Sequence, residues 1–246
     1  MSSRARRLLS LATVVVCAFF AARLVAHDWR WGAAILVGLV VFSVPAVLAR
    51  RRMRRVLLSG DVSSVLGTWE GSLSRVSHRE TMGPIMVATA YAAYGFMEEA
   101  RRSLSRAARG PAWEAAIEQR LFVEALLDLY EGERSRAIDK ATEMESLPLP
   151  PTGFWMRRKI ALLRRGFGAL TRAFAHASTE DDERLLKATG KSSPLVHWVM
   201  RYGRAVFLVD RGRTDEARAL LAAAPEWPEA SAFRSFHDEL TTRIAT

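Results

Sequence analysis

The sequence predicts an all-α protein: two apolar helices at the N-terminus, then a solenoid of about three to five helix pairs with a C-terminal capping helix. Two predominantly apolar stretches of 19 residues each stand near the N-terminus. The rest of the chain places apolar residues three and four positions apart, which indicates amphipathic helices. Glycines there recur at intervals of 34 to 46 residues. A period of this length is typical of stacked helix pairs.

The two apolar stretches, 8–26 and 31–49, predict a membrane hairpin within residues 1–55. Each has nearly the ~20 residues that a helix needs to cross the hydrocarbon layer of a bilayer. The second stretch carries no charged side chain, and the first carries only Arg23, near its far end, from where a long side chain can reach the headgroups. An alternative left open is that the first stretch is a cleaved signal peptide.

The N-terminal charge predicts the orientation of this hairpin. Residues 1–55 contain ten arginines and one acidic residue, and the arginines crowd the outer ends of the two stretches. Basic residues are retained on the cytoplasmic side of membranes, so both termini are expected in the cytoplasm. The bias towards arginine over lysine indicates a bacterial protein. We therefore expect a multi-pass protein of the inner (cytoplasmic) membrane with its repeat domain in the cytoplasm.

The net charge of +10 does not predict a nucleic-acid-binding body. The 191 residues after position 55 contain 26 basic and 25 acidic side chains, so almost all of the excess lies in the hairpin region. We expect no nucleic acid among the partners. The single cysteine, Cys17, allows no internal disulfide, which agrees with a reducing compartment.

Residues 56–80 are expected to form a juxtamembrane helix that is part of a first repeat, with Gly60 at a turn. The clearest unit follows at 81–112. It places a large and a small residue at Val87 and Ala88, and a glycine at Gly95. Small residues let two helices approach closely, and glycine lets the chain turn between them.

These units resemble tetratricopeptide repeats (TPR). Besides 81–112, the pattern recurs at 118–148 and 198–225, and more weakly at 152–178, where Trp155 falls on the family's tryptophan position and Gly166 on its turn position. Residues 228–244 carry an apolar stripe suited to a capping helix, composed of Phe233, Phe236, Leu240 and Ile244.

The resemblance implies a groove, formed by the first helix of each pair, that binds a protein partner. Mapped onto this chain, the groove residues are Ile85, Thr89, Phe122, Leu126, Tyr202 and Val206. An alternative is that the terminal helix of the chain fills this groove. We expect a membrane-anchored, non-enzymatic scaffold or adaptor, and leave a homo-oligomer open. The layout also resembles a bacterial membrane TPR protein associated with haem biosynthesis, so an accessory factor of a membrane-associated pathway is the alternative function.

Two groups of arginines are candidate contacts for anionic lipids or an acidic partner. Residues 157–172 carry six positive charges and no negative one, and a second cluster follows the apolar stretch 31–49. The alternative is a solvated helix face neutralised by the acidic residues of 179–183. The candidates are Arg50, Arg51, Arg52, Arg54, Arg55, Arg157, Arg158, Arg164 and Arg165.

No catalytic, metal-binding or cofactor-binding residues are predicted. The segment Gly190–Ser193 resembles the end of a phosphate-binding loop but lacks the earlier glycine that the motif requires. The histidines have no zinc-ligand spacing. An enzyme with an unrecognised site is the least favoured of the three functions.

Overall fold

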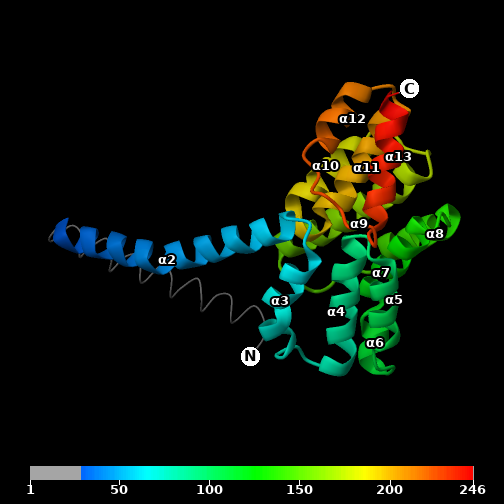
Figure 1. Ribbon diagram of the computed structural model, residues 1–246. Coiled ribbons are helices and arrows are strands. Elements are labelled where there is room, and N and C mark those ends of the chain that lie inside the picture. The colour runs from blue at the N-terminus through cyan, green and yellow to red at the C-terminus, as the bar shows by residue number, and fades with distance from the viewer. Residues whose placement is uncertain (1–28, 246) are drawn as a thin grey trace. The chain divides into compact units, whose positions relative to one another are not determined.

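The computed structural model describes residues 29–245, which form twelve α-helices and one short 3₁₀ helix (Figure 1). The predicted all-α class is confirmed. The chain divides into two compact units, residues 1–53 and 54–246. The second unit contains the packed helices and the core.

The first described helix, α2, runs from Trp29 to Leu58 and contains Pro45. It includes the expected span 31–49 and continues without a break through the arginine cluster. The other expected span, 8–26, lies outside the described residues. Among the described helices, none meets the length and hydropathy requirements of a membrane span.

The remaining helices pack in sequential pairs. The pairs are α4 with α5, α7 with α8, α9 with α10 and α11 with α12; α3 packs on α4, and α13 packs on the last pair. Their bounds are α3 Val62–Leu73, α4 Arg79–Ala93, α5 Met97–Ser105, α6 Pro111–Ala115, α7 Ile117–Tyr130, α8 Arg134–Ser146, α9 Phe154–Phe174, α10 Asp182–Ser192, η1 Pro194–Val196, α11 His197–Asp210, α12 Thr214–Leu221 and α13 Ala232–Ala245.

The four pairs share one turn geometry. Gly95, Gly132 and Gly212 follow the first helix of their pairs with φ of 80°, 83° and 70°, and His176 takes the same position in the third pair with φ of 55°. In each turn the following N–H bonds back five residues, as from Phe96 to the Tyr91 carbonyl at 2.9 Å. This is the Schellman motif, which favours glycine at its left-handed residue. The recurrent glycines therefore mark turns, as expected, in three of the four pairs.

The third pair corrects one expectation. Gly166 does not form a turn but lies within α9, a helix of 21 residues. A Cβ at this position would overlap the side chain of Thr189 in α10, so the glycine permits close packing between α9 and α10. Trp155 is 78 % exposed and has no place in the core. The weaker pattern of 152–178 thus belongs to a longer first helix whose turn comes ten residues later.

The stretch 57–66 joins α2 to α3 and is held at both ends. Asp61 caps α3, its carboxylate accepting a hydrogen bond from the Ser63 N–H at 3.0 Å. The Tyr94 hydroxyl donates to the Leu57 carbonyl at 2.7 Å, and the Trp198 indole N–H donates to the Leu58 carbonyl at 3.1 Å. These bonds connect the end of α2 to the first and the last helix pair.

The C-terminal segment also returns to the first pair. The Ser231 hydroxyl donates to the Tyr94 carbonyl at 2.7 Å, and the Ala232 N–H donates to the Gly95 carbonyl at 2.9 Å. In an open solenoid each repeat contacts only its neighbours. Here the C-terminal segment that follows the last pair bonds to the first pair, between residues 137 positions apart in sequence, and in this sense the array is closed.

Candidate functional site

The candidate site is a pocket of about 200 Å³ between the first helices of the pairs, which we call the central pocket. Its floor and walls are mainly apolar, and α4, α7, α8, α9, η1 and α11 contribute to it. The lining residues are Thr89, Glu118, Gln119, Phe122, Met144, Leu163, Arg164, Ser193, Leu195, Val196 and Met200.

Phe122 supplies the aromatic surface of the central pocket. It is only half-buried, and its ring lies 4.9 Å from that of Phe167, which is fully buried in α9. The apolar spacing of α7 directs Leu121, Ala125 and Leu129 into the core and leaves Phe122 beside them at the pocket. The phenyl ring thus packs on Phe167 and also lines the pocket.

An ion pair between the buried Arg164 and the half-buried Glu118 forms the polar side of the pocket. Arg164, only 4 % exposed, donates to both carboxylate oxygens of Glu118, with distances of 3.0 Å from Nε and 2.9 Å from Nη2. The same guanidinium donates to the Leu147 carbonyl and, at 3.4 Å, to the Pro148 carbonyl. Because planar guanidinium–carboxylate pairs are bidentate and directional, this cluster fixes α9 and the 147–153 loop against α7.

The six predicted groove residues do not share one open surface. Thr89 and Phe122 line the central pocket. The other four, Ile85, Leu126, Tyr202 and Val206, are at most 7 % exposed and pack inside the domain. Ile85 packs locally against Ala107, Trp113 and Ala116, whereas Tyr202 is covered by Phe233 of the terminal helix, the arrangement described by the alternative of a self-filled groove.

Tyr202 shows how the terminal helix covers one predicted groove position. Its ring stacks on Phe233 of α13, with centroids 4.8 Å apart and planes 9° from parallel. Its hydroxyl accepts from the Trp227 indole N–H at 2.8 Å and lies 3.1 Å from His237 Nδ1. Burial raises the pKa of the Tyr202 phenol. The side chain is therefore a structural hydrogen-bonding group of the core.

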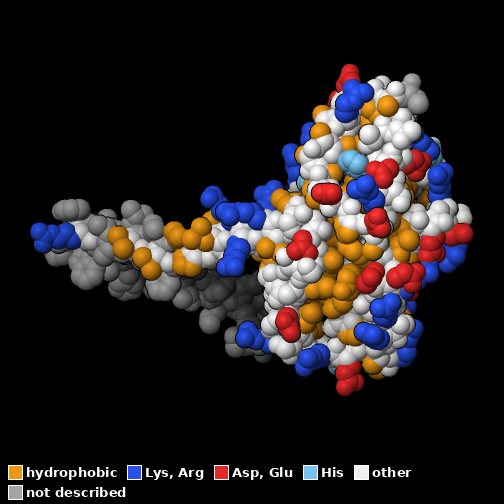
Figure 2. All heavy atoms as spheres, viewed as in Figure 1, with side chains coloured by type: hydrophobic (Ala, Val, Ile, Leu, Met, Phe, Trp, Pro, Cys, Tyr) orange, Lys and Arg blue, Asp and Glu red, His pale blue; other side chains and the backbone are white. Residues whose placement is uncertain are grey.

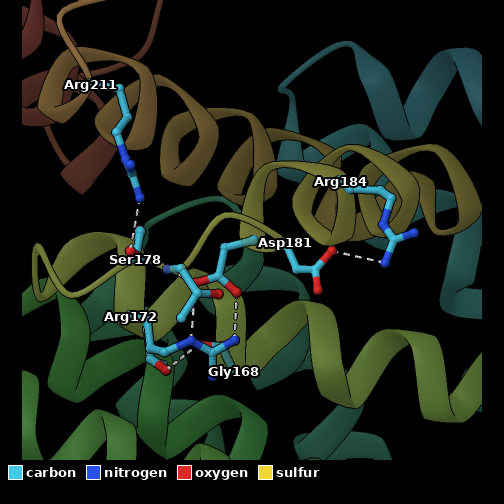
Figure 3. A network of polar contacts seen from close by, with 9 residues as sticks. Gly168, Arg172, Ser178, Asp181, Arg184 and Arg211 are labelled. Atoms are coloured by element: carbon cyan, nitrogen blue, oxygen red, sulfur yellow. Dashed lines mark hydrogen bonds and ion pairs between the residues drawn. The ribbon is translucent and has the colours of Figure 1, made fainter.

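The predicted arginine contacts separate into buried and exposed members. Arg164 belongs to the ion pair with Glu118 and offers no surface. The other members are exposed: Arg50, Arg51, Arg52, Arg54, Arg55, Arg157, Arg158 and Arg165. The neutralisation expected from 179–183 applies to Arg172, whose guanidinium pairs with the fully buried carboxylate of Asp182 at 2.6 and 3.0 Å (Figure 3).

Asp182 is the most completely buried carboxylate among the described residues. Burial by itself would raise its pKa, but hydrogen bonds from Arg172 and from the Thr179 N–H outweigh burial and lower the pKa below 3.8. Asp181, next in sequence, faces solvent and pairs only with the exposed Arg184 at 3.0 Å (Figure 3). Adjacent acids thus have different roles, one structural and one solvated.

The nearest approach to a catalytic arrangement is at the α9–α10 turn. His176 Nδ1 lies 2.8 Å from the Asp210 carboxylate. The nearby Ser178 hydroxyl is buried but makes no hydrogen bond, so no base is positioned to activate it. Within residues 29–245, no group of three or more histidine, cysteine or acidic side chains could hold a metal ion.

Most of the central pocket was not identified from the sequence. Met144, Leu163, Leu195 and Met200 occupy ordinary apolar positions on their helices, and Leu195 lies in the short η1 helix after α10. One signal in the sequence could have identified Glu118 and Arg164. They are opposite charges at positions of α7 and α9 where the helical spacing predicts apolar residues. Their pairing depends on the tertiary packing of residues 46 positions apart.

Comparison with known proteins adds no assignment. No family model, curated protein or solved structure matches this chain.

Proposed function

We propose that this chain is a membrane-anchored, non-enzymatic TPR-like scaffold that binds a protein partner through the central pocket, at the cytoplasmic face of a bacterial inner membrane. The proposal rests on the pocket itself. Phe122 lies on its apolar wall, and the Glu118–Arg164 pair lies on the other side.

The size of the pocket favours a side chain of a protein over a free small molecule. Sites for drug-sized ligands usually enclose about 300–1,000 Å³. At about 200 Å³, the central pocket suits one or two apolar side chains projecting from a peptide or helix. The Glu118 carboxylate and the exposed amide of Gln119 can then orient the backbone of that segment.

The TPR-like description is supported by the four helix pairs and their repeated Schellman turns. The closed array distinguishes this domain from an open solenoid. Because the terminal segment occupies much of the inner face, we propose recognition at one pocket and not along a continuous groove.

The membrane anchor is supported by the sequence of 31–49 and by the exposed side chains of α2. Val37, Val41, Val44 and Leu48 follow one stripe of the helix and are 45–60 % exposed. Figure 2 shows hydrophobic side chains along this helix. Water-soluble surfaces rarely expose such a continuous apolar stripe, whereas a bilayer or a second apolar helix would cover it.

A site-specific cross-link tests partner binding. A photoreactive amino acid in place of Gln119, at the rim of the pocket, should give a discrete cross-linked product in cells. The same replacement at Ala219, exposed on α12, serves as the control and should give none. Phe122→Arg should abolish the product at position 119 without lowering the melting temperature of the domain substantially. A product that persists in a folded Phe122→Arg variant would refute binding at the pocket.

A further inference from the structure

The first turn of α9 exposes three consecutive apolar side chains. Phe154, Trp155 and Met156 are 69 %, 78 % and 52 % exposed, and we call them the aromatic tip. Within the described part of 54–246, they are the only large hydrophobic side chains with such exposure. Three other tryptophans of this domain, Trp113, Trp198 and Trp227, are only 3–6 % exposed.

Cationic side chains follow the aromatic tip directly. Arg157, Arg158 and Lys159 occupy the next turn and are exposed, and Arg165 is exposed further along α9. None of the four has an ion-pair partner among the described residues. No acidic residue occurs between positions 146 and 179 of the sequence.

Two other arginines of α9 do have ion-pair partners. Arg164 and Arg172 each have a bidentate carboxylate partner contributed by another helix. Arg157 and Arg158, in contrast, face solvent beside the exposed rings of the aromatic tip. An aromatic and apolar tip bordered by cations is complementary to the surface of an anionic bilayer, where rings lie among the headgroups and cations bind phosphates.

We propose that the aromatic tip inserts into the interfacial layer of an anionic membrane, with Arg157, Arg158 and Lys159 on the lipid phosphates. A protruding tip with no surrounding walls does not suit a peptide, which binds in a concave site. Trp and Phe partition favourably into the headgroup region, and the three cations add attraction to anionic lipids. The domain 54–246 then touches the bilayer directly through α9. We infer this on the membrane location proposed above, but independently of the central pocket.

A fluorescent label at the tip tests the insertion in the full-length chain. Cys17→Ser removes the single native cysteine, and Met156→Cys then accepts an environment-sensitive dye next to the intact Trp155. The labelled chain is reconstituted into vesicles of phosphatidylcholine with or without phosphatidylglycerol. We expect a blue shift and quenching by brominated lipids in the anionic vesicles, and a weaker response in the neutral ones. The same dye at Ala219→Cys, on exposed α12, should respond in neither.

Charge variants separate lipid binding from simple hydrophobicity. At roughly 1 kcal/mol for each basic residue near an anionic surface, neutralising one cation should lower the inserted-to-free ratio about fivefold. We expect the triple variant Arg157→Gln, Arg158→Gln, Lys159→Gln to lose the anionic-lipid response. The matched variant Arg75→Gln, Arg102→Gln, Arg106→Gln removes three other exposed charges and should retain it.

Three results would overturn this proposal. The first is no blue shift at position 156 in anionic vesicles. The second is an equal response in both vesicle types, and the third is a concentration-dependent shift in detergent without lipid, which would instead indicate a second copy of the chain. Flotation of the chain with neutral vesicles reports the α2 anchor separately, and the cross-link at position 119 reports the pocket. Failure of the tip is therefore distinguishable from failure of the proposed function.

Discussion

The two ends of α9 differ in how far other helices cover them. Both are rich in arginine and aromatic residues. At the N-terminal end Phe154 and Arg157 face solvent, whereas further along Phe167 is 1 % exposed and Arg164 is 4 % exposed. The residue types are the same, so composition does not explain the difference. Neighbouring helices do: α8, α10 and α11 pack on α9, and most of its residues are buried from Arg164 onward, whereas those of the first turn are exposed.

On α9, a charged side chain is covered only where another helix supplies a partner of opposite charge. Glu118 from α7 and Asp182 from α10 neutralise the two covered arginines. Over the face of the domain seen in Figure 2, acidic and basic side chains are otherwise interspersed. The covered end of α9 is therefore stabilising structure, and the uncovered end is available for binding.

The largest effect should come from the aromatic residues of the two ends. Phe167→Ala removes a fully buried ring that contacts Phe122 and should lower the free energy of unfolding by about 3–5 kcal/mol. Phe154→Ala removes an exposed ring and should change it by less than about 0.5 kcal/mol. Thermal unfolding followed by circular dichroism in detergent measures both. Equal losses would show that the two ends are not differently covered.

The next effect concerns the two adjacent acids of α10. Asp182→Ala leaves the Arg172 guanidinium and the Thr179 N–H without their partner, and should cost about 2–3 kcal/mol of unfolding free energy. Asp181→Ala breaks only a solvent-exposed pair and should cost within about 0.5 kcal/mol. If the two variants melt together, the Arg172–Asp182 pair does not hold α10 on α9.

The same pair predicts a pH dependence. Because the folded-state pKa of Asp182 lies below its ordinary value of 3.8, the unfolded chain binds the proton more readily. The stabilisation is therefore complete above pH 3.8 and disappears as the pH falls through the folded-state pKa. The stability difference between the native chain and Asp182→Asn should be constant near neutral pH and shrink below pH 3.8. A difference that grows towards acid would contradict the assigned ion pair.

The smallest effects on the free energy of unfolding are expected at two helical glycines, where the same substitution should have opposite signs. Gly166→Ala should destabilise by about 1–3 kcal/mol, because its Cβ would overlap Thr189, whose hydroxyl bonds to the Leu162 carbonyl at 3.2 Å. Gly67→Ala in α3 meets nothing within 4 Å and should stabilise by up to about 1 kcal/mol through helix propensity. Stabilisation by both would mean that α9 and α10 are not closely packed at Gly166.

Much of the helical architecture follows from local rules. The three-and-four spacing predicts helices, and Gly95, Gly132 and Gly212 mark turns because a left-handed residue is easiest for glycine. The third turn, at His176, is an exception to that rule. His176 adopts the same geometry with a Cβ, so the third turn carried no glycine to reveal it, and Gly166 was assigned to the turn instead. The predicted capping helix 228–244 corresponds to α13, which begins later, at Ala232, and buries Phe233, Leu240 and Ile244 of the predicted apolar stripe.

The candidate site followed less well. Thr89 and Phe122 were identified because the pocket lies on the first helices of the pairs, as the repeat pattern implies. Ile85, Leu126, Tyr202 and Val206 were mapped as groove residues, with a groove filled by the terminal helix left as the alternative, because local spacing does not show which distant residue covers a position, as Phe233 covers Tyr202. Closure depends on single hydrogen bonds such as Ser231 to Tyr94 and Trp198 to Leu58, between residues with no local relationship.

The all-α class, the positions of most turns and the concentration of positive charge in the first 55 residues can be read from the sequence alone. These properties depend on neighbours within a few positions or on composition. Which arginines of α9 are buried, which aromatic residues are exposed and where a pocket remains become visible only in the packed structure. Those outcomes depend on which distant helix covers each residue, because burial is a property of the packed chain and not of its local pattern.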